Sequence, residues 1–197
     1  MKPAENLKIV LVNTPDSGLG AGFEDHLVAS GHTIAGRCLR DDELLAAVDG
    51  CKPDLLVICA ALPVDGLLSA MEAISDRGTC PVIFYSASSA PADIRSIVSA
   101  GANAIAAGSG RHTEFHTLVD VAFAEFKKTS ALRRERDAAV AKLAERKLVE
   151  RAKGIIMKER NLGEDEAYRL LRKLAMDRSE PLIQLATKVI EASRLLK

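Results

Sequence analysis

Six basic side chains and one tyrosine near the carboxyl end of this 197-residue chain are of the types that bind nucleic acid. They are Arg146, Lys153, Lys158, Arg169, Arg172, Lys173 and Tyr168. Lysine and arginine contact phosphates, and a dense group of them can follow the shape of an RNA hairpin. Tyr168 is the only aromatic residue after Phe126, and its ring suits either stacking on an unpaired base or packing between helices. We therefore expect a nucleic-acid-binding surface in this segment.

Other residues that carry out chemistry in proteins lack the partners that such chemistry needs. His112 and His116 stand four residues apart, but no carboxylate lies at an offset that would complete a metal site. Three serines that stand close together, Ser86, Ser88 and Ser89, have no histidine nearby in sequence for a hydrolase triad. The glycine-rich stretch GLGAGF does not match a dinucleotide-binding fingerprint. The four cysteines are scattered and indicate reduced, mostly buried thiols. We expect neither an enzyme, nor a metal site, nor a cofactor.

The charge of the chain is unevenly divided, although its 27 basic and 27 acidic side chains cancel. Residues 1–126 hold 8 Lys and Arg against 16 Asp and Glu, a net charge of −8, and residues 127–197 hold 19 against 11, a net charge of +8. This division is typical of an acidic regulatory domain joined to a nucleic-acid-binding domain, and it also fits two halves that attract each other. No apolar run approaches the ~18 residues of a membrane span, and no signal peptide is present, so we expect a cytoplasmic protein.

The first half alternates apolar runs with amphipathic stretches, as parallel sheets covered by helices do. The predicted strands are Leu7–Val12, Thr33–Gly36, Leu55–Cys59, Val82–Ser86 and Asn103–Ala106. The predicted helices cover about residues 19–30, 41–50, 66–77 and 91–100. Five such units in about 120 residues predict an α/β, flavodoxin-like, doubly wound sheet of five strands.

Residues 111–153 contain neither glycine nor proline and are rich in helix formers, which predicts one long helix of about 65 Å. Apolar residues at approximate helical spacing favour a coiled-coil stalk, whereas the imperfect heptads leave a solvated single helix open. Further helices, to Arg160, from Glu164 to Met176 and from Pro181 to Leu196, predict an all-α three-helix unit. We expect its core to include Ala152, Gly154, Met157, Leu171 and Met176, with the glycine allowing close helix packing.

The first half resembles the receiver domains of response regulators. In those domains an acidic pair, an aspartate, a Ser or Thr and a lysine hold Mg²⁺ and transfer a phosphoryl group to the aspartate. The corresponding positions here are Asn13 and Thr14 for the pair, Cys59 for the phospho-acceptor, Ser86 for the hydroxyl and Gly108 for the lysine. Ser86 alone is retained. The resemblance therefore implies a pseudo-receiver that works without phosphorylation.

Residues 143–176, LAERKLVERAKGIIMKERNLGEDEAYRLLRKLAM, resemble the ANTAR domain of bacterial transcription antiterminators. The matching positions include Arg146, Ala152-Lys153-Gly154, Met157, Ala167-Tyr168, Leu171-Arg172 and Ala175-Met176. With the pseudo-receiver and the stalk, the whole chain resembles the AmiR/NasT group and looks most like its NasT type, the nitrate-assimilation regulators. The resemblance implies a pseudo-receiver domain at 1–126, a helical coiled-coil linker at 127–142 and an ANTAR domain at 143–197.

The resemblance implies an antiterminator that binds two hairpins in a leader mRNA and prevents formation of a terminator. It also implies control by a NasS-like ligand-sensing partner rather than by phosphorylation, and a homodimer at least when RNA is bound. An AmiR-like version with another ligand remains open. Two other classes are a DNA-binding helix-turn-helix protein and a protein–protein adaptor whose basic surface meets the acidic domain of a second copy. The ANTAR pattern fits the last helices better than a helix-turn-helix does, so we expect no DNA binding.

Overall fold

The computed structural model describes residues 6–14, 17, 22–39, 41–107 and 115–195, and Gly108 and His112 therefore lie outside the described residues. The chain forms two compact units, residues 1–131 and residues 132–197. None of the helices in these described ranges is both long enough and apolar enough to cross a membrane.

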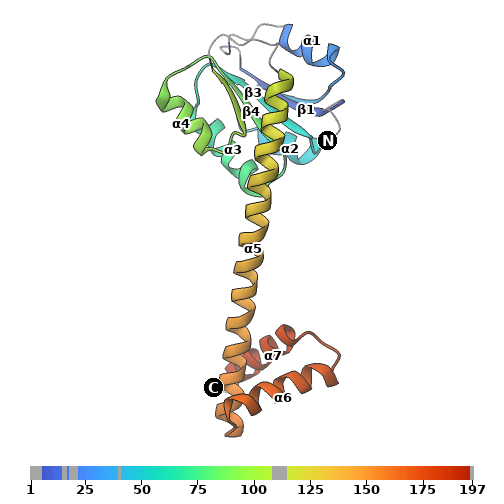
Figure 1. Cartoon of the computed structure of the whole chain (residues 1–197), viewed down its shortest axis with the longest axis vertical. Coiled ribbons are helices and arrows are strands. Elements are labelled where there is room, and N and C mark those ends of the chain that lie inside the picture. Colours follow the sequence, from blue (N-terminus) through green and yellow to red (C-terminus); the bar gives the residue numbers. More distant parts are fainter. Residues whose placement is uncertain (1–5, 15–16, 18–21, 40, 108–114, 196–197) are drawn as a thin grey trace. The chain divides into compact units, whose positions relative to one another are not determined.

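The first unit is built on a parallel sheet of five strands (Figure 1). The strands are β1 (Lys8–Asn13), β2 (Thr33–Cys38), β3 (Leu55–Ala60), β4 (Val82–Ser86) and β5 (Ala104–Ala107). Their order across the sheet is β2-β1-β3-β4-β5, the doubly wound order of flavodoxin-like domains. The expected α/β fold of this half is confirmed.

Helices cover both faces of the sheet, which explains why the inner strands are apolar along their whole length. The helices of this unit are α1 (Gly22–Ala29), α2 (Leu44–Cys51), α3 (Asp65–Arg77), α4 (Pro91–Ser99) and the first part of α5 (Phe115–Arg160). One face packs on α2, α3 and α4, and the other packs on α1 and α5 through side chains such as Phe23 and Phe115. All six residues of β3 are buried.

Helix α5 runs without a break through Gly154. The sequence predicts a close helix approach at this glycine, but Gly154 is exposed, and a Cβ atom added there would meet no atom within 4 Å. That prediction is wrong. The helix ends at Arg160, where Asn161 takes a left-handed backbone with φ of 51° and Leu162 N–H donates to the carbonyl of Met157. Asparagine tolerates this conformation better than most residues, so it ends the helix at low cost.

The second unit is a bundle of three helices, formed by the last part of α5 with α6 (Glu164–Asp177) and α7 (Leu182–Leu195). Its core is formed by small and aliphatic side chains from all three helices: Ala152, Ile156, Ala167, Leu171, Ala175, Leu185, Ala186 and Ile190. The prediction of Ala152 and Leu171 as core is confirmed, and Met157 packs against this core while partly exposed. Met176 is 70% exposed and is not a core residue. It lies on the face of α6 opposite the buried side chains, which the apolar character of methionine does not reveal.

Candidate nucleic-acid interface

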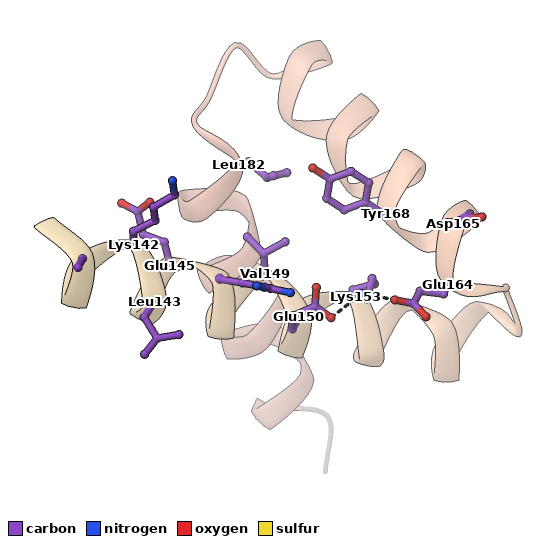
Figure 2. Close-up of a pocket in the computed structure, with 12 residues that line it drawn as sticks. Lys142, Leu143, Glu145, Val149, Glu150, Lys153, Glu164, Asp165, Tyr168 and Leu182 are labelled. Atoms are coloured by element: carbon purple, nitrogen blue, oxygen red, sulfur yellow. Dashed lines mark hydrogen bonds and ion pairs between the residues drawn. The ribbon is translucent and has the colours of Figure 1, made fainter.

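A hollow of about 810 Å³ opens on the three-helix unit between α5, α6 and the start of α7 (Figure 2). On α5 its lining includes Ala139, Lys142, Arg146 and Lys153, which share one helix face at spacings of three, four and seven residues. The opposite wall is formed by α6, with Tyr168 and its neighbours in the first turns. Three residues predicted to contact nucleic acid, Arg146, Lys153 and Tyr168, therefore lie on one concave surface.

Lys153 lies on the floor of this hollow and joins its two walls. Its Nζ atom lies 2.5 Å from Oε2 of Glu150 and 2.7 Å from Oε1 of Glu164, and its side chain is only 9% exposed (Figure 2). The hydrogen bond to Glu150, and then the one to Glu164, raise the pKa of Lys153. The sequence predicts a phosphate contact for Lys153, but its charge is already balanced by two carboxylates. The geometry gives it the role of holding α5 to the first turn of α6.

Tyr168 extends into the hollow from α6, and its hydroxyl points toward Leu182 (Figure 2). The residue is 42% exposed and does not belong to the core of the unit. The sequence left stacking on a base and packing between helices open for this ring. An aromatic ring that is exposed to this extent retains surface on which a base can stack.

A second hollow, of about 470 Å³, adjoins the first and shares Tyr168 and Leu182 with it. Its lining includes Arg172, Met176 and Pro181. Arg172 and Met176 follow Tyr168 at intervals of four residues, so the three side chains lie along one stripe of α6. Among the ion pairs of the described residues, none involves Arg146 or Arg172, and both guanidinium groups are free to bind an anion.

The remaining predicted RNA contacts, Lys158, Arg169 and Lys173, are exposed but line neither hollow. Arg169 donates a hydrogen bond to the backbone oxygen of Asp165 at 3.3 Å. Sequence reasoning missed Lys142, which lies one turn before Arg146 on the same face of α5. The four-residue spacing of Lys142 and Arg146, which places both on one helix face, is the sequence signal that could have identified Lys142.

In the first unit, the sheet register brings most of the degenerate phosphorylation positions to the carboxyl edge. Asn13 pairs with Cys59 between β1 and β3, and Ser86 pairs with Ala60 between β3 and β4. Thr14 Oγ1 donates to the carbonyl oxygen of Cys59 at 3.3 Å. The side-chain oxygen of Asn13 accepts a hydrogen bond of 2.7 Å from Ser17, and Ser86 Oγ accepts one of 3.1 Å from the backbone N–H of Ser88. These polar groups satisfy one another locally.

Cys59 lies at the phospho-acceptor position but is completely buried, and burial raises the pKa of its thiol. A neutral buried thiol is a poor nucleophile and a poor metal ligand. Within the described ranges, no group of three or more His, Cys, Asp or Glu side chains is placed to hold a metal ion.

Comparison with known proteins assigns the helical unit. Residues 137–190 match the family model of the ANTAR domain. The chain contains an ANTAR domain. The chain is 36% identical over 53 residues to the Nitrate regulatory protein of Klebsiella oxytoca, a match that covers 27% of this chain and 13% of that one. The ANTAR match begins at residue 137, so Ala139 and Lys142 of the first hollow belong to it.

Most of the chain is similar to one curated relative. The chain is 25% identical over 182 residues to the Transcriptional regulatory protein PdtaR of Mycobacterium tuberculosis, covering 92% of this chain and 89% of that protein. The chain is thus similar over most of its length to a protein named as a transcriptional regulator.

Solved structures confirm the receiver fold of the first unit. The signal receiver domain of a modulated diguanylate cyclase from Desulfovibrio desulfuricans G20 superimposes with a TM-score of 0.51 at 17% identity, covering 64% of this chain and 99% of that domain. A two-component response regulator of the LuxR family from Aurantimonas sp. SI85-9A1 gives a TM-score of 0.50 at 18% identity, covering 61% and 86% of the two chains. At this identity the likeness concerns the fold alone.

Proposed function

We propose that this protein is an RNA-binding transcription antiterminator, which binds two hairpins of a leader mRNA through its ANTAR domain. The observation that carries the proposal is the exposed ring of Tyr168, which lines two adjoining hollows that hold one free cation each, Arg146 and Arg172. Cations attract the phosphate backbone, and an aromatic ring stacks on unpaired bases in RNA loops. Lys142 adds a further cation to the larger hollow, and Lys158, Arg169 and Lys173 are exposed cations elsewhere on the domain.

The regulatory input of the proposed antiterminator is a protein partner and not a phosphoryl group. This proposal is supported by the buried thiol of Cys59 and by the mutual hydrogen bonds of the polar groups around it. We assign the partner the role of a NasS-like sensor of nitrate or nitrite. The match of 53 residues of the chain to a protein named for nitrate regulation supports this choice, and an AmiR-like partner for another ligand is the alternative.

We further propose that the protein binds RNA as a homodimer paired along α5. Leu132 is 58% exposed and Leu143 55% exposed, and with Ala139 they form one stripe of this helix. A dimer presents two ANTAR domains, which matches two hairpins. The division at residues 126 and 142 into pseudo-receiver, linker and ANTAR domain remains our proposal for the organisation of the chain.

The direct test is a mobility-shift assay with the full chain and RNA that carries two hairpins, selected from a pool with randomised loops. Single hairpins and duplex DNA of equal length serve as competitors across a salt series. We expect selective binding of the two-hairpin RNA that persists at physiological salt. Equal binding to all three would reduce the basic surface to nonspecific attraction and favour the adaptor function, and a preference for duplex DNA would favour the helix-turn-helix function.

A further inference from the structure

We propose that the ANTAR domain reads two consecutive unpaired nucleotides along α6. One base stacks on Tyr168, the next base contacts Met176, and Arg172 binds the phosphate between them. This inference rests on the proposed RNA-binding function and assigns it a dinucleotide subsite.

The exposure of Met176 is the first observation behind this subsite. Of the large apolar side chains described in the ANTAR domain, Met176 is the most exposed, at 70%. A flexible, polarisable thioether packs well against flat aromatic groups, and a nucleobase offers such a face. Met176 lies eight residues after Tyr168 on the same stripe of α6, with Arg172 midway between them.

The spacing along α6 sets the number of bases. At ~1.5 Å per residue, Tyr168 and Met176 are separated by about 12 Å along the helix, and Arg172 is about 6 Å from each. Stacked bases repeat every ~3.4 Å along a strand, so two neighbouring bases that remain stacked cannot span this separation. Two consecutive bases of an unstacked loop can do so, and the phosphate that links them then lies beside Arg172.

The smaller hollow suits this ligand better than the larger one. The lining of the larger hollow holds three cations against four carboxylates, and Lys153 is paired with two of those carboxylates, so the formal charge of this lining is −1. In the smaller hollow Arg172 is free, whereas the single carboxylate, Glu180, is paired with Lys188. Free positive charge therefore adjoins exposed aromatic and apolar surface at the smaller hollow.

The far wall of the smaller hollow is preformed. Ser179 has a left-handed backbone with φ of 51°, its N–H donates to the carbonyl of Met176, and Glu180 N–H donates to the carbonyl of Ala175, both at 3.0 Å. These bonds fix the turn that carries Pro181 and Leu182 into the wall. A preformed wall lowers the ordering cost of binding a flexible RNA loop.

The test uses the full chain and a hairpin RNA selected from a pool with a fixed stem and a randomised loop. Each loop nucleotide of the selected RNA is replaced in turn by an abasic nucleotide. Affinities are measured for the unmodified protein, for Tyr168→Leu and for Met176→Ala. Val98→Ala is the control, because Val98 is a similarly exposed apolar residue, at 55%, that lies in the first unit.

We expect two adjacent abasic positions each to weaken binding by the unmodified protein about tenfold. The loss at one position should vanish in Tyr168→Leu and the loss at its neighbour in Met176→Ala, while Val98→Ala behaves as the unmodified protein. Circular dichroism confirms that each variant is folded.

The dinucleotide subsite is overturned if Met176→Ala keeps both the affinity and the abasic profile of the unmodified protein, a result that leaves RNA binding intact and marks Met176 as a protein contact. It is also overturned if the two coupled positions are not adjacent. Selection of no RNA at all would instead refute the proposed function.

Discussion

The ammonium group of Lys153 lies 2.7 Å from Oε1 of Glu164, across the turn that separates α5 from α6. The lysine side chain is 9% exposed and the glutamate side chain 69% exposed, so the ion pair joins a buried cation to a solvent-exposed carboxylate. Glu166 strengthens the same turn, because its carboxylate accepts a 3.1 Å hydrogen bond from the backbone N–H of Gly163. Together these contacts fix the angle at which α6 leaves α5, and hence the shape of the hollow between them.

Replacing Glu164 by glutamine tests this ion pair through its pH dependence. Its hydrogen bond from Lys153 lowers the pKa of Glu164 below 4.5, so the stabilisation is present above that pH and is lost as the pH falls through the lowered pKa. The pKa of Lys153 is raised above 10.5, so the stabilisation is complete below that pH and is lost at higher pH. We expect Glu164→Gln to lower the Tm modestly from about pH 5 to pH 10, and the difference to disappear in stronger acid. Thermal unfolding followed by circular dichroism measures it, with the exposed Glu159→Gln as control.

Arg172→Gln should weaken hairpin binding without unfolding the domain, because the side chain is exposed and forms no ion pair among the described residues. We expect a loss of about five- to tenfold and a decrease of about one in the slope of log affinity against log salt. Titrations at several salt concentrations measure both, and Lys127→Gln, an exposed cation of the first unit, is the control. An unchanged slope would remove Arg172 from the interface. Lys153→Glu should instead lower the Tm, because it places three carboxylates together.

Much of this fold could be predicted because the decisive signals are local in sequence. Runs such as that of β3 are buried on both sides, and the turn before Glu164 has both a helix-ending asparagine and a cluster of acidic residues for the next helix. The wrong predictions concern which face of a helix is buried, and not where the helices and strands lie. Gly154 and Met176 lie on helix faces that the packing of the three helices leaves exposed, and the pairing of Lys153 with Glu164 joins two helices. Such contacts depend on tertiary placement, which neither residue type nor spacing specifies.

His32 should make the first unit sensitive to acid. It is 4% exposed, its Nδ1 accepts a hydrogen bond from Leu7 N–H, and its ring lies 6.0 Å from that of His116. Burial, followed by the charges of His116 and His26, lowers its pKa below 6.5. As the pH falls below 6.5 the unfolded chain binds a proton that the folded protein rejects, so stability decreases.

The variant that checks this is His32→Asn, which keeps a hydrogen-bond acceptor near Leu7 but does not titrate. We expect its Tm to fall less between pH 7 and pH 5 than that of the unmodified protein, on the scale set by the ordinary histidine pKa of about 6.5. His116→Asn, which changes an exposed residue, should retain most of the decrease. An identical acid dependence in His32→Asn would contradict the assignment.

Leu132→Glu tests the proposed dimer. The side chain is 58% exposed on α5 and lines neither hollow, so a charge there should disturb pairing of α5 but not the RNA-binding surface. Sedimentation velocity with RNA should show a dimer for the unmodified protein and a monomer for the variant. Leu39→Glu, at 68% exposure in the first unit, is the control that should remain dimeric. A strict monomer of the unmodified protein under all conditions would refute the pairing.

Cys59→Ser should leave RNA binding and its control by a partner nearly unchanged, because a buried thiol with a raised pKa takes no part in phosphoryl chemistry. The hydroxyl enters an apolar strand, so we expect a loss of stability of about 1–3 kcal/mol. Thermal unfolding measures the loss, and in vitro transcription through a terminator measures the response. A lost response in a folded variant would show that the thiol carries a redox signal.

The burial of Cys59 also has a consequence for timing. A phosphorylated aspartate stores a signal in a covalent bond, and the lifetime of that signal is the half-life of an acyl phosphate. The buried thiol of Cys59 holds no phosphoryl group that could preserve a signal in this way. If a partner protein delivers the signal, as we propose, the signal persists only while that partner stays bound or stays away, and the duration of the response is set by a dissociation rate and by the supply of the partner's ligand.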